Sequence, residues 1–329
     1  MRAALFEKRS LEDLRIVEVD EPKINDDEVL IRVVKAGVNP VDYMTVTVLP
    51  VNPLPHIPGR EFAGIVEKVG KNVKNVVEGD KVAVYTRIFD GTCDMCLDKK
   101  EMLCRRGGRI GTDTNGGFAE YVNVKAKNVF KIELDWDIAA SLPVSALTSY
   151  HALKEAQVKI GDYVVVFGAS GNTGMFAVQI AKMMGANVIA ISRKYWLKEF
   201  GADYIFAYED AIQKVKDVTN NKMVDVVINS IGNKFFDLSY ELLKPGGKLV
   251  LFGSLTGSEA KINLSNIYNK HAYIMGTTGG TLKEFYDLIQ IAHKLKVRIW
   301  KNYKLDEIAT AIKNIFSSER DGRIMIIPR

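Results

Sequence analysis

The sequence lacks any hydrophobic run of the roughly 18 residues that a membrane-spanning helix needs, and its N-terminus, MRAALFEKRSLEDLRIVEV, lacks the sustained apolar segment of a secretory signal. It also lacks a strong excess of either charge: 45 Lys and Arg residues stand against 40 Asp and Glu residues, and the two signs are interspersed. A nucleic-acid binder concentrates positive charge on one face. We therefore expect a cytoplasmic protein that acts on a small molecule, with neither nucleic acid nor a membrane as a partner.

Cysteine is scarce and confined to one segment. The only three cysteines lie between positions 93 and 104, in the pattern D-x2-C-x2-C-x7-C. An odd number in one short stretch does not suit a disulfide framework, whereas closely spaced thiolates can wrap a zinc ion, which takes four ligands and accepts a carboxylate oxygen among them. The pattern predicts a metal site made of Asp90, Cys93, Cys96 and Cys104. The alternative is a lobe without metal, with three oxidation-prone thiols.

Two domains are expected from 329 residues of which 47% are hydrophobic. Between residues 28 and 124, short runs rich in β-branched residues are separated by turn residues, which predicts an all-β domain. After Gly161, apolar strands alternate with amphipathic helices, the pattern of a doubly wound parallel sheet. Two helical patterns after residue 281 and a final RIMII strand suit a return to the first domain. The predicted domains are 1–123 with 277–329, and 124–276.

A glycine-rich turn marks a dinucleotide site in the second domain. The predicted strand Tyr163 to Phe167 runs into Ala169-x-Gly171-x-x-Gly174 and then into a helix. Such a turn lets backbone N–H groups at a helix N-terminus approach a pyrophosphate closely. The predicted cofactor contacts are Ala169, Ser170, Gly171, Asn172, Thr173, Gly174 and Gly253.

The end of the next strand distinguishes NADPH from NADH. It reads Ser192-Arg193-Lys194 and offers no carboxylate for a ribose 2'-hydroxyl, while a hydroxyl and two cations suit a 2'-phosphate. We therefore expect NADPH as the cofactor. The alternative is that Arg193 and Lys194 only begin a solvated helix.

Four further segments resemble a known superfamily. The runs Gly59–Val66, Gly79–Val82, Gly116–Tyr121 and Lys244–Gly247 are similar to signatures of the medium-chain dehydrogenase/reductase superfamily, which includes zinc-type alcohol dehydrogenases and quinone oxidoreductases. The resemblance implies an α/β protein in which a GroES-like catalytic domain, built from both ends of the chain, surrounds a Rossmann domain. It also implies an active site between the domains and a homodimer or homotetramer. The cysteine segment is similar to the family's structural-zinc lobe, with Asp90 in place of the first of four cysteines, which implies one structural zinc per chain.

The ligands of the family's catalytic zinc do not carry over. The corresponding positions hold Asn39, Arg60 and Val144, the last of these four residues before Thr148, where the family has a residue that touches the nicotinamide. The positions of the family's proton relay hold Val41 and Met44. An alcohol would be neither polarised nor deprotonated in the usual way.

The segment from Ala36 to Asp42 instead resembles the zinc-free quinone and enoyl reductases. This resemblance implies hydride transfer from NADPH to a carbonyl-conjugated double bond or to a quinone. The candidate catalytic residues are Asn39, Tyr43, Arg60 and Thr148, of which Tyr43 is the only phenol immediately beside the segment. Tyr43 is the predicted proton donor, with water as the alternative. Arg60 would attract an anionic or thioester substrate, unless it forms a salt bridge with Glu61 or another neighbour. Two other functions remain open: an alcohol or aldehyde dehydrogenase, and an NADPH-binding protein without turnover.

Overall fold

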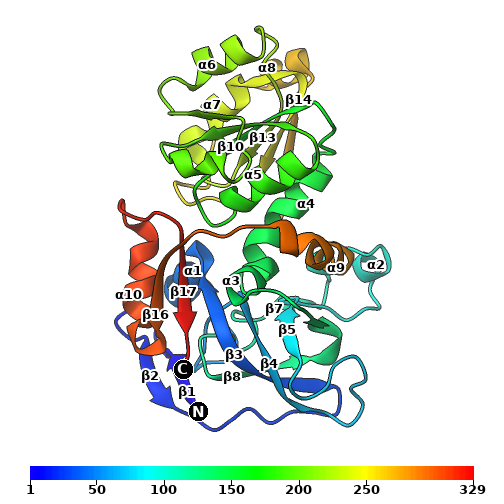
Figure 1. Ribbon diagram of the computed structural model, residues 1–329, viewed down its shortest axis with the longest axis vertical. Coiled ribbons are helices and arrows are strands. Elements are labelled where there is room, and N and C mark those ends of the chain that lie inside the picture. The colour runs from blue at the N-terminus through cyan, green and yellow to red at the C-terminus, as the bar shows by residue number, and fades with distance from the viewer. The chain divides into compact units, whose positions relative to one another are not determined.

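The computed structural model describes residues 1–329 and divides into two compact units (Figure 1). The first domain comprises residues 1–144 and 281–329, and the second comprises residues 145–280. The first boundary lies later than the predicted one at 123/124 because β9 (Val129–Lys131) pairs with β5 (Lys81–Val84) and keeps this segment in the first sheet. The second boundary, predicted at 276/277, also lies later, because the chain stays with the second sheet beyond its last strand: the Thr277 backbone N–H donates to the Leu251 carbonyl at 3.0 Å.

A seven-stranded sheet forms the centre of the first domain. Its strand order is β16-β17-β3-β4-β5-β9, and β8 also pairs with β3. The domain's strands are β1 (Arg2–Leu5), β2 (Arg15–Glu18), β3 (Glu28–Val38), β4 (Phe62–Val69), β5, β6 (Arg87–Ile88), β7 (Gly108–Arg109), β8 (Tyr121–Lys125), β9, β16 (Ile299–Lys304) and β17 (Arg323–Ile327). Its helices are α1 (Pro40–Thr47), α2 (Asp94–Leu97), α3 (Trp136–Ala139), α9 (Leu282–Ile291) and α10 (Ile308–Lys313).

The C-terminal segment completes this sheet, as the sequence predicted. β17 pairs antiparallel with β3, so that the red strand lies beside the blue one in Figure 1. Side chains two apart on a strand share a face, and Val29, Ile31 and Val33 of β3 join Ile324 and Ile326 of β17 in one buried cluster. Residues from opposite parts of the sequence thus share one hydrophobic core.

The second domain is a six-stranded parallel sheet in the order β12-β11-β10-β13-β14-β15, which confirms the predicted doubly wound fold. Its strands are β10 (Tyr163–Phe167), β11 (Asn187–Ile191), β12 (Tyr204–Phe206), β13 (Val224–Asn229), β14 (Leu243–Leu251) and β15 (Tyr273–Gly276). Its helices are α4 (Leu147–Glu155), α5 (Gly174–Met183), α6 (Ala211–Val218), α7 (Phe236–Glu241) and α8 (Leu264–Lys270). The strand order reverses between β10 and β13, and ligands of such sheets bind at this switch point.

Both faces of the parallel sheet are covered. Val165 and Phe167 of β10 belong to a buried cluster with Ala211 and Val215 of α6, while α5 packs against β10 and β11. This explains why the strands read as continuous apolar runs rather than as alternating patterns. No helix combines the length and the hydrophobicity that a membrane span requires.

A fully buried ion pair connects separate segments of the first domain. The Glu61 carboxylate accepts a hydrogen bond from the Arg323 guanidinium, and both side chains are 0% exposed. Glu61 also accepts from the Asn39 amide (2.7 Å) and from the Val144 backbone N–H (3.0 Å). Gly37 lies beside the pair, and a Cβ there would approach an Arg323 nitrogen to 2.3 Å. Only glycine leaves room for the pair at this point of β3.

We expect Arg323→Ala to destabilise the first domain by about 3–5 kcal/mol, because it leaves a buried carboxylate without its counter-charge. Denaturant unfolding, followed by the fluorescence of Trp136 and Trp300 in this domain, measures the loss. Lys283→Ala is the control: it breaks an exposed pair with Asp287 on α9 and should cost about 0.5 kcal/mol or less. Similar small losses for both variants would contradict the structural role of the buried pair.

Candidate functional site

Asn39 and Asp42 are held at the start of α1. Asn39 is the N-cap, and its backbone N–H donates to the Asp42 carboxylate at 2.8 Å. The same carboxylate accepts the backbone N–H of Arg60 at 3.2 Å. Burial raises the pKa of Asp42 to about 7, so its carboxyl group is only partly ionised at neutral pH. Asp42 is therefore a fully buried residue that positions the backbone of Asn39 and Arg60.

Arg60 is a buried cation whose side chain is only 8% exposed. The alternative expectation of a salt bridge to Glu61 is wrong, because Glu61 pairs with Arg323. The Nε atom of Arg60 is buried without a hydrogen-bond partner. Burial, together with the charges of Arg87 and Arg109, lowers the pKa of Arg60 to about 9.

The structure brings together some of the predicted catalytic residues. Asn39 and Val144 both donate to Glu61, and Arg60 precedes it in the chain. Tyr43 lies one helical turn after Asn39 on α1, where its ring packs edge-on against the half-exposed Phe316 at a centroid distance of 4.9 Å and against the core of the first domain. Its role as proton donor stays a prediction.

Thr148 lies in the second domain, buried on α4, which packs against α5. Sequence reasoning missed the roles of Asp42, Glu61 and Arg323. The signal for Asp42 was present, because an acid three residues after an Asn N-cap is typical of a capping box. No comparable signal marked Arg323, which lies 262 residues from Glu61.

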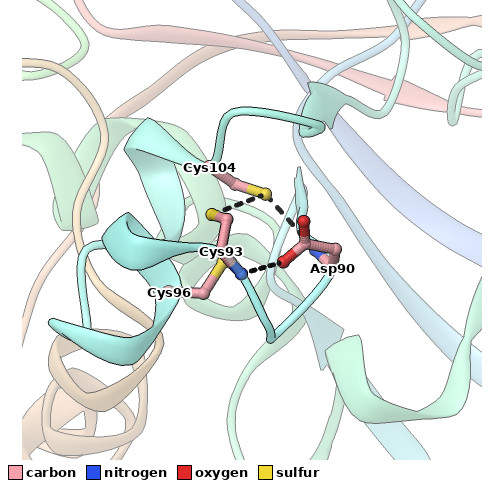
Figure 2. A group of neighbouring side chains, drawn as sticks. All are labelled: Asp90, Cys93, Cys96 and Cys104. Atoms are coloured by element: carbon pink, nitrogen blue, oxygen red, sulfur yellow. Dashed lines mark hydrogen bonds between the residues drawn. The ribbon is translucent and has the colours of Figure 1, made fainter.

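The predicted metal ligands converge in a lobe of the first domain. Figure 2 shows the three sulfur atoms and the Asp90 carboxylate directed toward one another. The potential ligand atoms of Asp90, Cys93, Cys96 and Cys104 all lie within 4.8 Å of one another. Two factors bring them together: α2 begins directly after Cys93, and the backbone N–H of Cys93 donates to Asp90 at 2.9 Å.

The spacing of these atoms fits a tetrahedral zinc ion. Two thiolates bound to one zinc at about 2.3 Å lie about 3.8 Å apart, and the Sγ atoms of Cys93 and Cys104 are 3.8 Å apart. This is far longer than a disulfide of about 2.0 Å. Backbone N–H groups of Thr92 and Cys93, together with Arg106, hold the pKa of Asp90 well below its usual range. Asp90 is therefore ionised, as a ligand must be.

The glycine-rich turn joins β10 to α5 as predicted. Ala169 is fully buried, and Asn172 and Gly174 are buried at the start of the helix. A Cβ on Gly174 would lie 2.1 Å from the Gly168 carbonyl oxygen, so only glycine allows the helix to approach the strand so closely. Gly253, which follows β14, packs in the same way against Ser230 after β13. These residues lie at the carboxyl ends of the central strands.

Beside this turn lies a pocket of about 500 Å³ that is rich in cations. Its lining residues are Ser170, Ser192, Arg193, Lys194, Tyr208, Glu209, Lys234 and Phe235. The rings of Tyr208 and Phe235 stack at a centroid distance of 4.3 Å. The single carboxylate, Glu209, is paired with Arg193 at 2.7 Å. Lys234 is a third cation that the sequence did not reveal. A hydroxyl, three cations and two aromatic rings fit a ribose that carries a phosphate.

Comparisons with known proteins agree with this architecture. Residues 25–134 match the model of the alcohol dehydrogenase GroES-like domain, and residues 173–294 match that of the zinc-binding dehydrogenases. An alcohol dehydrogenase of Geobacillus stearothermophilus is 33% identical over 338 residues, covering 99% of each chain. An acryloyl-coenzyme A reductase of Sulfurisphaera tokodaii is 29% identical, covering 95% of this chain and 96% of its own.

A solved structure is also closely similar. The cobalt- and zinc-bound thermostable alcohol dehydrogenase of Pyrobaculum aerophilum has a TM-score of 0.94 and 38% identity, covering 100% of this chain and 99% of its own. A GroES-like β domain joined to a doubly wound domain defines a class of two-domain oxidoreductases. The chain belongs to that class as a member of the medium-chain dehydrogenase/reductase superfamily.

Proposed function

We propose that the protein is an NADPH-dependent reductase that transfers hydride to a carbonyl-conjugated double bond or to a quinone, without a catalytic zinc. The observation that carries this proposal is the set Asn39, Arg60 and Val144 around Glu61. A guanidinium and an aliphatic side chain offer no lone pair to a metal, which leaves one weak amide oxygen. Such a set does not fit a zinc site.

The names of the relatives support two different functions for the protein. The Sulfurisphaera tokodaii relative is named for acryloyl-coenzyme A, whose double bond is conjugated to a thioester carbonyl. The Geobacillus and Pyrobaculum relatives are named as alcohol dehydrogenases, which supports the alternative of an alcohol dehydrogenase. The residues around Glu61, Asn39, Arg60 and Val144, offer few metal ligands, which favours a reductase over an alcohol dehydrogenase.

The residues of the chain would assist hydride transfer electrostatically. Bound NADPH supplies the hydride, and the acceptor's oxygen gains negative charge. A conjugated acceptor spreads this charge over several atoms, so it needs weaker stabilisation than a simple ketone. Glu61 orients the Asn39 amide, Arg60 adds a buried positive charge, and Thr148 on α4 is proposed to contact the nicotinamide.

We predict that NADPH binds at least tenfold more tightly than NADH, a difference of about 1.4 kcal/mol in binding free energy. Arg193→Ala should weaken NADPH binding selectively, because it removes a cation and leaves Glu209 uncompensated. Glu209→Gln should instead increase the preference for NADPH over NADH. Fluorescence titration of both cofactors measures these changes, with Lys214→Ala, a cation outside the pocket, as the control. Equal affinities of the unmodified protein for NADPH and NADH would contradict the assignment.

We propose one structural zinc per chain, bound by Asp90, Cys93, Cys96 and Cys104. Elemental analysis should find one metal ion, and a chelator should lower the thermal midpoint more than the initial rate. Asp90→Ala should weaken zinc binding, whereas Asp94→Ala, which only breaks the exposed pair with Arg105, should not. Two metals per chain would argue against the zinc-free active site, and none would favour a lobe with free thiols.

The acceptor preference tests the reaction itself. We expect enones, enoyl thioesters or quinones to oxidise NADPH faster than any matched simple aldehyde or ketone, at an initial rate that a chelator leaves unchanged, because no metal polarises the oxygen. The loss of NADPH absorbance measures the initial rate with each acceptor, with and without the chelator. Efficient, chelator-sensitive oxidation of alcohols would restore the alcohol dehydrogenase alternative. Tight NADPH binding with no turnover across the panel would indicate a non-catalytic protein.

A further inference from the structure

Two arginines face each other in a very short ladder of the first domain. β6 and β7 form a separate two-stranded antiparallel sheet in which Arg87 is paired directly with Arg109. Like charges directly opposite each other on a ladder are destabilising. Both arginines line a pocket of about 280 Å³ that also includes Asp113 and Glu101. The fold thus holds two positive charges together at the wall of a cavity.

Arg60 adds a third positive charge to this pair. The turn after β7 lies against it, since a Cβ on Gly111 would be 3.0 Å from Arg60 Cγ. The charges of Arg87 and Arg109 act on Arg60 strongly enough to lower its pKa, after burial itself. Its Nε, buried without a partner, is a donor that a ligand would satisfy.

The carboxylates nearby balance these cations only in part. Asp113 accepts from both the backbone N–H and the Nε of Arg109, each at 2.9 Å. Glu101 also lines the pocket and accepts the backbone N–H of Leu282 at 3.1 Å. Asp42 is fully buried, and burial raises the pKa of its carboxyl group to about 7, which weakens its negative charge at neutral pH. Three guanidinium groups therefore face two pocket carboxylates, Asp113 and Glu101, and the cluster has a small excess of positive charge.

We propose that Arg60, Arg87 and Arg109 form a binding site for a small oxyanion, a carboxylate or a phosphate. Guanidinium groups hold such anions through paired hydrogen bonds, and an anion between Arg87 and Arg109 would relieve their mutual repulsion. The further step, that this anion is a group of the substrate, rests on the proposed function. The binding itself does not, and its test needs neither NADPH nor an electron acceptor.

Calorimetric titration of the full-length, zinc-loaded protein with inorganic phosphate, and separately with propionate, tests the proposal. Arg87→Gln and Arg109→Gln should each weaken binding at least tenfold, while Arg105→Gln in the neighbouring segment should leave it unchanged. Phosphate binding that is lost in Arg193→Ala is assigned to the cation-rich pocket of the second domain. Tighter binding of phosphate would indicate a phosphorylated ligand, and tighter binding of propionate a carboxylic acid.

The thermal midpoint separates binding from a structural role. Whatever its melting temperature without added anion, Arg87→Gln should lose the upward shift in melting temperature that phosphate or propionate causes in the unmodified protein. Arg87→Lys, which keeps the charge without the guanidinium fork, should retain part of this shift. Binding lost only in Arg193→Ala, or no binding of either anion at millimolar concentration, would overturn the proposal.

Discussion

The buried ion pair between Glu61 and Arg323 is the interaction on which the rest of the first domain depends. Two charges removed from water are costly unless their hydrogen-bonding capacity is satisfied. Glu61 meets this condition by also accepting from Asn39 and Val144, whereas Nε and Nη1 of Arg323 are buried without a hydrogen-bond partner. The pair thereby connects β4, β17, the start of α1 and the segment before the second domain. Because the proposed catalytic residue Asn39 is bonded to this pair, the geometry of the site follows from the stability of the fold.

Positive charge is concentrated in a different way in each domain. The second domain gathers exposed cations around the end of β11, where solvent offsets most of their repulsion. The first domain buries Arg60 and sets Arg87 opposite Arg109, which are both only partly exposed, so that solvent offsets less of their repulsion. Exposed cations select among anions that arrive from solution, whereas buried ones stabilise an anion that has already left water.

Much of this arrangement was predictable from local patterns. The parallel strands, the turn from Ala169 to Gly174 and the convergence of Asp90 with the cysteines follow from periodicity, glycine placement and ligand spacing. Features that depend on distant partners were not predictable. Nothing near Tyr43 indicates that its ring packs against Phe316. A two-residue ladder is likewise too short to be recognised in a sequence, so the opposition of Arg87 and Arg109 appeared only in the structure.

The place of β17 between β16 and β3 also has a consequence for how the protein is made. Domains generally fold as units during synthesis, and the second domain, residues 145–280, is continuous in the chain. The first domain is not: residues 1–144 emerge from the ribosome long before Arg323 can meet Glu61. Until then the edge of β3 that β17 will cover is unpaired, and Glu61 has no counter-charge. The domain that begins first is therefore finished last, and chaperones have their longest opportunity to bind at that open strand edge.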